Sequence, residues 1–142
     1  KEFQCEYLLD KELYSEAEEI KINILNNLTN KKENFVFFNV LTYLDCEFKT
    51  KVITYLKEKE KRIINYTTEI EETLFFDYMM VIHNEKVVME GNAKSVLLEE
   101  KILTKLGFKL PFIVELSLGL KYYGLIDKTY FNNDELVGAL WK

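Results

Sequence analysis

The hydrophobic pattern of this chain predicts strands that alternate with helices. Four apolar residues stand in a row at Phe35–Phe38, with no polar residue among them. Such a run is typical of a parallel strand that is buried on both faces. A second short strand is expected at Arg62–Tyr66. The segment from Asp45 to about Lys61 predicts an amphipathic helix between them. We therefore expect the two strands to pair in parallel or to lie in one sheet.

Two further helices are expected on either side of this strand–helix–strand unit. Ser15, followed by glutamates in the first turn, predicts the start of a helix that runs to about Asn30. An acidic segment that begins at Glu69 predicts another helix, which ends near Phe76.

A hairpin and then a helical tail are expected in the second part of the chain. Tyr78–Ile82 and Val87–Gly91 are two apolar runs around a short polar turn, which predicts a β-hairpin. Three helices are then expected, at 94–106, 111–123 and 133–141. We predict an α/β domain over residues 1–91 and a small helical domain over residues 92–142.

Composition narrows the class of protein. The chain has 142 residues, 48% of them hydrophobic, which is enough for a packed core. A net charge of −5 gives no basic surface for nucleic acid. No apolar run reaches the ~20 residues that a membrane span needs. In the absence of a signal peptide we expect Cys5 and Cys46 to be free cytosolic thiols.

The glycines exclude one kind of site. All five lie at or after position 91. The first ninety residues therefore hold no phosphate-binding loop of the form GxxxxGK[ST]. We expect the chain to begin downstream of such a loop or never to have had one.

The order of these segments resembles the second half of an ATP-binding cassette (ABC) ATPase domain. Five segments carry the resemblance over residues 13–91: Leu13–Ala17 at the place of the signature motif, Phe35–Asn39 as the Walker B strand, Leu44-Asp45 as the D-loop, Ile63–Glu72 as the switch segment and Tyr78–Gly91 as the following hairpin. The resemblance implies a partial P-loop NTPase sheet with flanking helices.

The tail is similar to the carboxyl-terminal helical domain of the ATPases of energy-coupling-factor (ECF) importers. The matching positions are Leu106-Gly107, Pro111, Glu115-Leu116, Gly124-Leu125 and Glu135–Val137. In that family this domain helps two ATPase subunits to dimerise, which implies the same role for residues 92–142.

The resemblance also assigns five candidate site residues. Asn39 and Val40 stand where the family has the Walker B aspartate and the catalytic glutamate, and Thr68 stands at the switch histidine. Ser15 is the one residue kept from the signature motif. Asp45 matches the D-loop aspartate, although a helix N-cap is at least as good an interpretation. Neither Asn39 nor Val40 can act as a general base. We expect no intact catalytic, cofactor or metal site.

The resemblance implies a degenerate ATPase subunit, or its carboxyl-terminal half, in an ECF-type importer. Its partners would be another ATPase subunit and a transmembrane coupling protein, and its place the cytoplasmic face of the membrane. ATP and Mg²⁺ would bind only if upstream residues or a partner completed the site. Two alternatives stay open: a stand-alone interaction module, and a fragment of a longer ATP-binding protein.

The remaining candidates have simpler interpretations. Glu71 and Glu72 are helix-start acids, His83 is an exposed turn residue, and Tyr78–Met80 is core. Trp141 is either packed in the tail or an anchor for a partner. Because a sheet that lacks its other strands has an open edge, we expect residues 1–14, a second copy or a partner to cover it.

Overall fold

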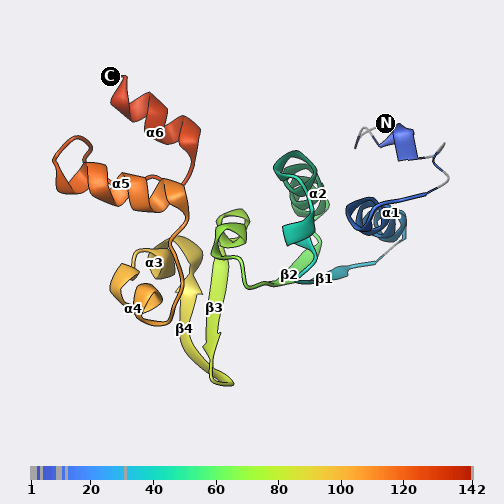
Figure 1. Ribbon diagram of the computed structural model, residues 1–142, viewed down its shortest axis with the longest axis horizontal. Helices are drawn as coiled ribbons and strands as arrows, with labels where there is room; N and C mark the ends of the chain where they lie inside the picture. Colours follow the sequence, from blue (N-terminus) through green and yellow to red (C-terminus); the bar gives the residue numbers. More distant parts are fainter. Residues whose placement is uncertain (1–2, 4, 9–10, 12, 31, 142) are drawn as a thin grey trace. The chain divides into compact units, whose positions relative to one another are not determined.

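The chain folds into two compact units. The computed structural model describes residues 3, 5–8, 11, 13–30 and 32–141. Its contacts group into an amino-terminal unit, Lys1–Glu69, and a carboxyl-terminal unit, Ile70–Lys142. Figure 1 gives the labels of the helices and strands. The predicted boundary between residues 91 and 92 divides an ATPase-like domain from a helical domain. These contact-based units do not test that boundary, which stays a prediction.

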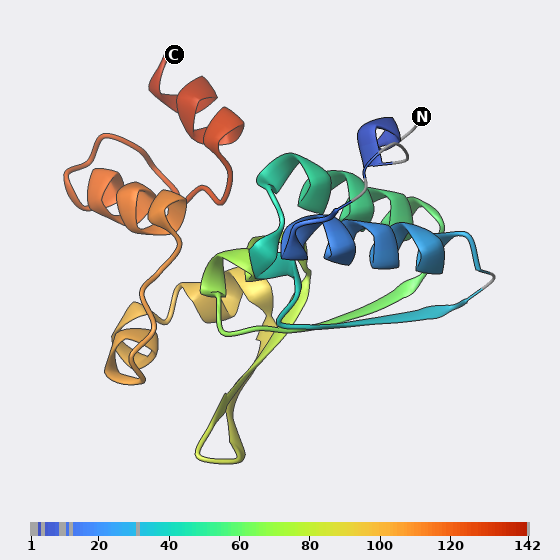
Figure 2. The ribbon, with the colours of Figure 1, turned by 45° about the vertical axis from the view of Figure 1, so that its right-hand side comes forward.

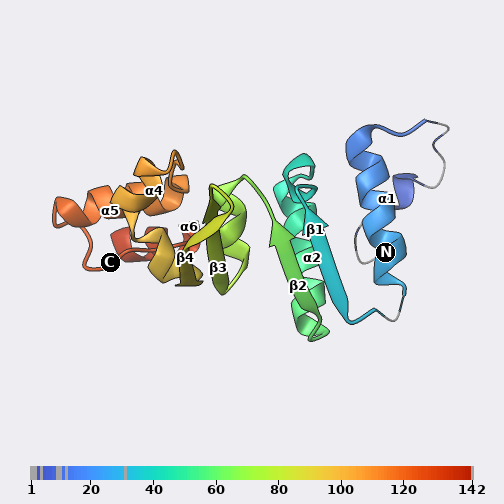
Figure 3. The same ribbon diagram turned by 90° about the horizontal axis from the view of Figure 1, so that it is seen from below.

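The amino-terminal unit is a strand–helix–strand unit with an extra helix before it. Strands β1 (Asn34–Phe38) and β2 (Arg62–Tyr66) pair in parallel, with Phe35 opposite Ile63 and Phe38 opposite Tyr66 (Figure 3). Helix α1 (Glu16–Leu28) precedes β1, and α2 (Cys46–Glu58) connects the two strands. Single turns of 3₁₀-helix lie at η1 (Glu6–Leu8) and η2 (Leu41–Tyr43). The predicted parallel pairing is confirmed.

Both helices cover the same face of this sheet, as Figure 2 shows. Phe35 and Phe37 are buried beneath them, at 8% and 5% exposure. The prediction that β1 is buried on both faces is wrong for this chain, since Val36 and Phe38 are 66% and 68% exposed. The physical reason is that the sheet has two strands and a helical layer on one side only.

The exposed face of this sheet is apolar on both strands. Ile64 and Tyr66 of β2 are 62% and 49% exposed. The rings of Phe38 and Tyr66 stack at a centroid distance of 4.9 Å and an interplanar angle of 5°. We call Val36, Phe38, Ile64 and Tyr66 the bare sheet face.

The described residues before α1 add no strand to this sheet. The ring of Phe3 instead contacts the rings of Phe48 and Tyr55 on α2, at centroid distances of 6.1 and 5.6 Å. Among the described residues, neither β1 nor β2 has a second strand partner. The described residues among 1–14 therefore do not cover the edge of this sheet with a strand. The prediction that a second copy or a partner covers the edge remains.

The carboxyl-terminal unit consists of a hairpin and short helices. Strands β3 (Tyr78–His83) and β4 (Lys86–Asn92) pair antiparallel, as predicted. Asn84 and Glu85 form the turn with φ of 48° and 60°, the conformation of a tight hairpin turn. The helical elements of this unit are η3 (Ile70–Phe75), α3 (Ala93–Leu97), α4 (Glu100–Lys105), α5 (Phe112–Tyr122) and α6 (Asn133–Leu140).

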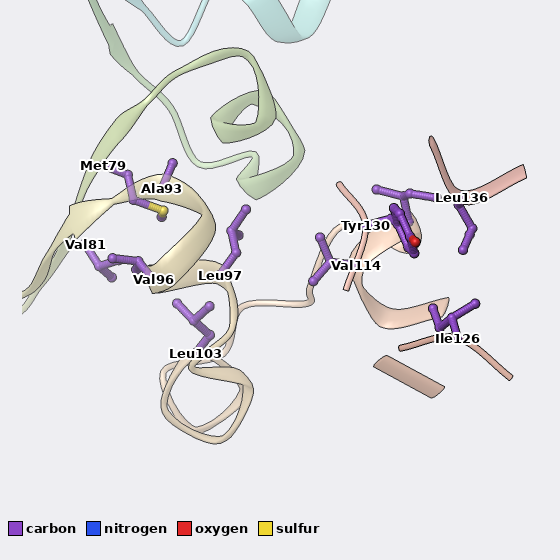
Figure 4. Packing of buried hydrophobic residues seen from close by; sticks show 11 residues of the cluster. Met79, Val81, Ala93, Val96, Leu97, Leu103, Val114, Ile126, Tyr130 and Leu136 are labelled. Atoms are coloured by element: carbon purple, nitrogen blue, oxygen red, sulfur yellow. The ribbon is translucent and has the colours of Figure 1, made fainter. Parts of the chain in front are cut away.

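One hydrophobic cluster unites the hairpin with these helices (Figure 4). Leu97, Leu103 and Val114 are fully buried in it. The other buried members are Met79, Val81, Ala93, Val96, Ile113, Ile126, Tyr130 and Leu136. The cluster draws on every helix from α3 to α6, so this unit has a core of its own.

Two predicted helices differ in the structure. The helix expected at 94–106 is two helices, α3 and α4, with a break after Leu97. On one straight helix Leu97 and Leu103 would point about 120° apart. The break lets both enter the core. The helix expected at 69–76 is the 3₁₀-helix η3, in which the Thr73 hydroxyl donates to the carbonyl of Ile70.

Two smaller predictions also have an outcome here. Only Met79 of the Tyr78–Met80 segment is buried, since strand alternation turns Tyr78 and Met80 outward at 59% and 50% exposure. Trp141 is 86% exposed, so packing within the tail is wrong for the described residues. His83 is exposed, as predicted.

Candidate functional site

The carboxyl ends of the two parallel strands bring two predicted site residues together. Asn39 follows β1 directly, and Thr68 lies two residues beyond β2. The Asn39 amide N–H donates to the carbonyl of Tyr66 at 2.7 Å, which extends the strand ladder by one bond. Parallel pairing therefore places both side chains at one edge of the sheet, where α/β proteins usually hold their ligands.

Asn39 and Thr68 are in polar contact with each other. The Asn39 Oδ1 atom lies 3.4 Å from both the backbone N and the Oγ1 of Thr68, so both bonds are long. Asn39 has a φ of 51°, a left-handed conformation that asparagine adopts more readily than most residues. The pair offers neutral hydrogen-bonding groups and no charge, so it has neither a general base nor an anionic metal ligand.

Val40 lies beside this pair in the chain but faces a different feature. It lines an open cavity of about 280 Å³ between α1 and β1. Ile20, Ile24 and Phe37 contribute apolar surface to the same cavity, and Asn23 and Asn27 contribute polar groups. A valine in this place offers no proton acceptor.

Asp45 is engaged at the start of α2. Its Oδ1 accepts a hydrogen bond from the Phe48 amide at 2.8 Å, which makes Asp45 the N-cap. Its Oδ2 lies 2.6 Å from the Nζ of Lys21 on α1. The hydrogen bond from Lys21, with that from the Phe48 amide, lowers the pKa of the Asp45 carboxyl. The helix-cap interpretation is confirmed, and the D-loop role stays a prediction.

Ser15 is likewise engaged locally. It is the N-cap of α1 in a reciprocal capping box with Glu18. The Ser15 hydroxyl donates to Glu18 Oε2 at 3.0 Å, and the Ser15 amide donates to the same atom at 2.9 Å. Hydrogen bonds from Lys11 and Ser15 lower the pKa of Glu18 to about 2. The predicted helix start is confirmed, and the signature role stays a prediction.

Sequence reasoning missed two contacting residues. Lys21 pairs with Asp45 across 24 positions, and its Nζ also lies 5.2 Å from the centre of the Phe48 ring. Glu71, interpreted as a helix-start acid, accepts a hydrogen bond from the Phe112 amide at 3.1 Å. No local pattern signals either contact, because both partners are remote in the chain.

The described residues hold no cluster of three or more histidine, cysteine, aspartate or glutamate side chains fit for a metal ion. None of the helices in this part of the chain is both long and apolar enough to cross a bilayer.

Comparison with known proteins identifies the family. No family model matches the chain. The energy-coupling factor transporter ATP-binding protein EcfA1 of Mesomycoplasma hyopneumoniae strain J is 31% identical over 145 residues, which span 98% of this chain and 52% of the relative. The chain is homologous to the energy-coupling factor ATP-binding proteins. The EcfA1 proteins of Mycoplasmopsis synoviae and Clostridium novyi are 30% and 28% identical over 94% and 90% of this chain.

The chain spans about half the length of these relatives. Its mixed fold, with a parallel strand pair, a hairpin and a helical tail, is consistent with the carboxyl-terminal half of an ABC ATPase of the energy-coupling-factor kind. The resemblance recognised from the sequence is thus confirmed at the level of the family.

Proposed function

We propose that this chain is the carboxyl-terminal part of an ATP-binding subunit of an ECF-type importer, and that its role there is structural. The observation that carries the proposal is the Asn39–Thr68 pair. Those residues occupy the carboxyl ends of paired parallel strands, the place for ATPase chemistry, but offer only neutral side chains. Homology to an energy-coupling factor ATP-binding protein over nearly the whole chain supports the assignment to this kind of importer.

In this proposal the chain binds no ATP and Mg²⁺ by itself. A bound triphosphate needs a glycine-rich loop and a lysine, and Mg²⁺ needs an anionic ligand. ATP binds only where upstream residues or a partner subunit supply these groups. Hydrolysis then depends on carboxylates that Asn39 and Val40 do not replace, a loss that typically costs ~10²–10⁴ in rate.

The proposed partners are a competent ATPase subunit and a transmembrane coupling protein, which would hold the chain at the inner surface of the cell membrane. The bare sheet face supports a partner polypeptide on the amino-terminal unit, because a parallel pair normally has both faces covered. Exposed apolar residues on the helical tail support the dimer role; they include Tyr122, Tyr123, Leu125, Val137 and Trp141.

Co-purification combined with nucleotide binding tests this function. We expect the tagged chain to recover ECF ATP-binding and transmembrane subunits from its own cells, and the chain alone to bind no ATP at micromolar concentrations by calorimetry. Micromolar ATP binding by the chain alone would contradict the structural role. Failure to recover any ATPase or membrane subunit would contradict the proposed role in an importer.

The half-length match also favours a second candidate, a fragment of a longer ATP-binding protein. A gene that encodes a phosphate-binding loop upstream of Lys1 in the same reading frame would support it. The third interpretation, a stand-alone interaction module, predicts instead a stable homodimer by native mass and no membrane partner.

A further inference from the structure

The edge of β1 that faces away from β2 presents backbone groups that no strand pairs. On the β2 side, the Arg62 amide donates to the Glu33 carbonyl at 2.9 Å. The Asn39 amide donates to the Tyr66 carbonyl at 2.7 Å. Because backbone groups alternate in direction along a strand, every second residue of β1 bonds to β2. The residues between them turn their N–H and C=O groups to the opposite edge, which has no strand partner among the described residues; they are Asn34, Val36 and Phe38.

A groove follows the same edge. Helix α1 lies on the side of β1 that faces away from β2, as Figure 3 shows. Between α1 and β1 is the open cavity of about 280 Å³, and Ile20, Ile24, Phe37 and Val40 give it an apolar wall. A strand that paired with the edge of β1 would turn every second side chain into this cavity.

The end of the groove next to the start of β1 carries a positive charge. Lys32, two residues before β1, lines the cavity. Its Nζ donates to the Oδ1 of Asn27 at 2.6 Å, and this acceptor is neutral. Within the described part of the chain Lys32 forms no ion pair. A carboxylate on an occupant of the groove would therefore meet an opposite charge at this end.

We propose that the edge of β1 is a strand-addition site for a partner polypeptide. The occupant is an extended segment that is apolar at alternate positions and has an acidic side chain next to Lys32. Backbone hydrogen bonds give such a complex its affinity, and alternate side chains give it specificity. A small apolar molecule in the cavity would leave the edge groups of β1 without partners. The proposal concerns this edge alone and holds whether or not the chain serves an importer.

Hydrogen exchange of the full chain with a synthetic peptide tests the site. The probe is a capped peptide of about seven residues, which alternates valine and threonine and has a glutamate at each end. Exchange at the Val36 and Phe38 amides should slow about tenfold when the free peptide is at about ten times its Kd. The amides of Phe35 and Phe37 already bond to β2 and are the internal comparison. Slowing at Phe35 and Phe37 alone, or no slowing at millimolar peptide, would overturn the proposal.

Removal of single N–H groups tests pairing through the backbone. Two versions of the peptide are N-methylated at alternate amides, so that only one of them keeps the donors that face β1. One version should lose binding and the other should keep it, and equal binding by both would overturn strand addition. In the protein, Val36→Pro removes an edge N–H and leaves the bonds to β2 in place. It should weaken binding about fivefold, the usual effect of one lost hydrogen bond.

Charge reversal tests the acidic position of the occupant. Lys32→Glu should weaken binding of the glutamate peptide about fivefold at low salt. A peptide with lysine at each end should bind this variant more tightly than it binds the parent chain. Lys101→Glu makes the same change at an exposed position of α4 and is the matched control, with no change expected. Unchanged binding of both peptides by Lys32→Glu would contradict an acidic occupant.

The chain alone distinguishes a partner from a second copy. The Val36 and Phe38 amides should exchange rapidly without peptide. Their protection in a homodimer would assign the edge to a second copy and overturn the proposal. If Val36→Pro fails to fold, the methylated peptides and Lys32→Glu decide the outcome.

Discussion

The two units both contain a two-stranded sheet with one buried and one exposed face, but the exposure has a different meaning in each. In the hairpin, Met79 and Val81 are buried while Tyr78 and Met80 are exposed. Antiparallel sheets commonly have one face in water, so this is an ordinary arrangement. In the amino-terminal unit the sheet is parallel, and parallel sheets occur almost only with both faces covered.

The difference indicates which unit has a sheet face without a covering layer of its own. The carboxyl-terminal unit has a closed cluster to which its hairpin and helices contribute. The amino-terminal unit has two helices on one side, the bare sheet face on the other, and two strands without a second strand partner among the described residues. This exposed face fits the proposed partner polypeptide, which would supply the second layer of the sheet.

The largest expected effect tests whether the units are separate. Leu56 on α2 and Leu103 on α4 are fully buried, one in each unit. Substitution of either by alanine should cost about 2–5 kcal/mol in the unit that contains it, because a cavity is left. Amide exchange measured per residue checks this. Equal losses in both units from either substitution would show one cooperative structure and break the comparison.

A smaller effect tests the closed core of the carboxyl-terminal unit. The fully buried Ser117 hydroxyl accepts a hydrogen bond from the Tyr130 amide at 2.7 Å. Ser117→Ala should cost about 1–3 kcal/mol, because it leaves a buried N–H without a partner. Chemical denaturation measures the loss, with the exposed Ser95→Ala as control. A loss no larger than that of the control would mean that water reaches this core.

Asp45 gives a smaller effect in the amino-terminal unit. Asp45→Ala should cost about 1 kcal/mol through loss of the α2 cap, whereas Asp45→Asn keeps an acceptor and should cost less. Because its pKa is lowered, the Asp45 contribution is present at neutral pH and declines as the pH falls through the folded pKa. Thermal unfolding of the three chains from pH 7 to pH 3 checks this. A gap between parent and Asp45→Asn that widens in acid would contradict it.

The smallest effect concerns the start of α1. The pKa of Glu18 is lowered to about 2, so its capping contribution should be present above the ordinary glutamate pKa and should fade only as the pH approaches 2. The carboxyl chemical shifts of Glu18 during an acid titration check this. Titration of Glu18 near the ordinary glutamate pKa would mean that the capping box does not persist in solution.

Local patterns were sufficient to predict most of the fold. Ser15 and Asp45 start the helices that their side chains cap, and the apolar runs at Phe35–Phe38 and Tyr78–Ile82 form strands. The predictions that failed depend on what surrounds an element. The run at Phe35–Phe38 carries the signal of a doubly buried strand, yet Val36 and Phe38 are exposed.

The sequence predicts the contacts of the candidate site only where the order of strands and helices determines which residues lie close together. Parallel pairing brings Asn39 to Thr68, and the order of the elements is enough to expect that. The partners of Asp45 and Phe112 are 24 and 41 positions away, and their contacts depend on packing that no local spacing encodes. The roles carried over from the ATPase family to these positions remain predictions.

Association through the bare sheet face tests the central claim most directly. The measurement is recovery of ECF ATP-binding and transmembrane subunits by the tagged chain, by Phe38→Asp, and by Thr54→Asp, which adds the same charge at an exposed position of α2. The account predicts recovery by the parent chain and Thr54→Asp and a loss with Phe38→Asp, while all three chains unfold at similar temperatures. Undiminished recovery by a folded Phe38→Asp chain would contradict it.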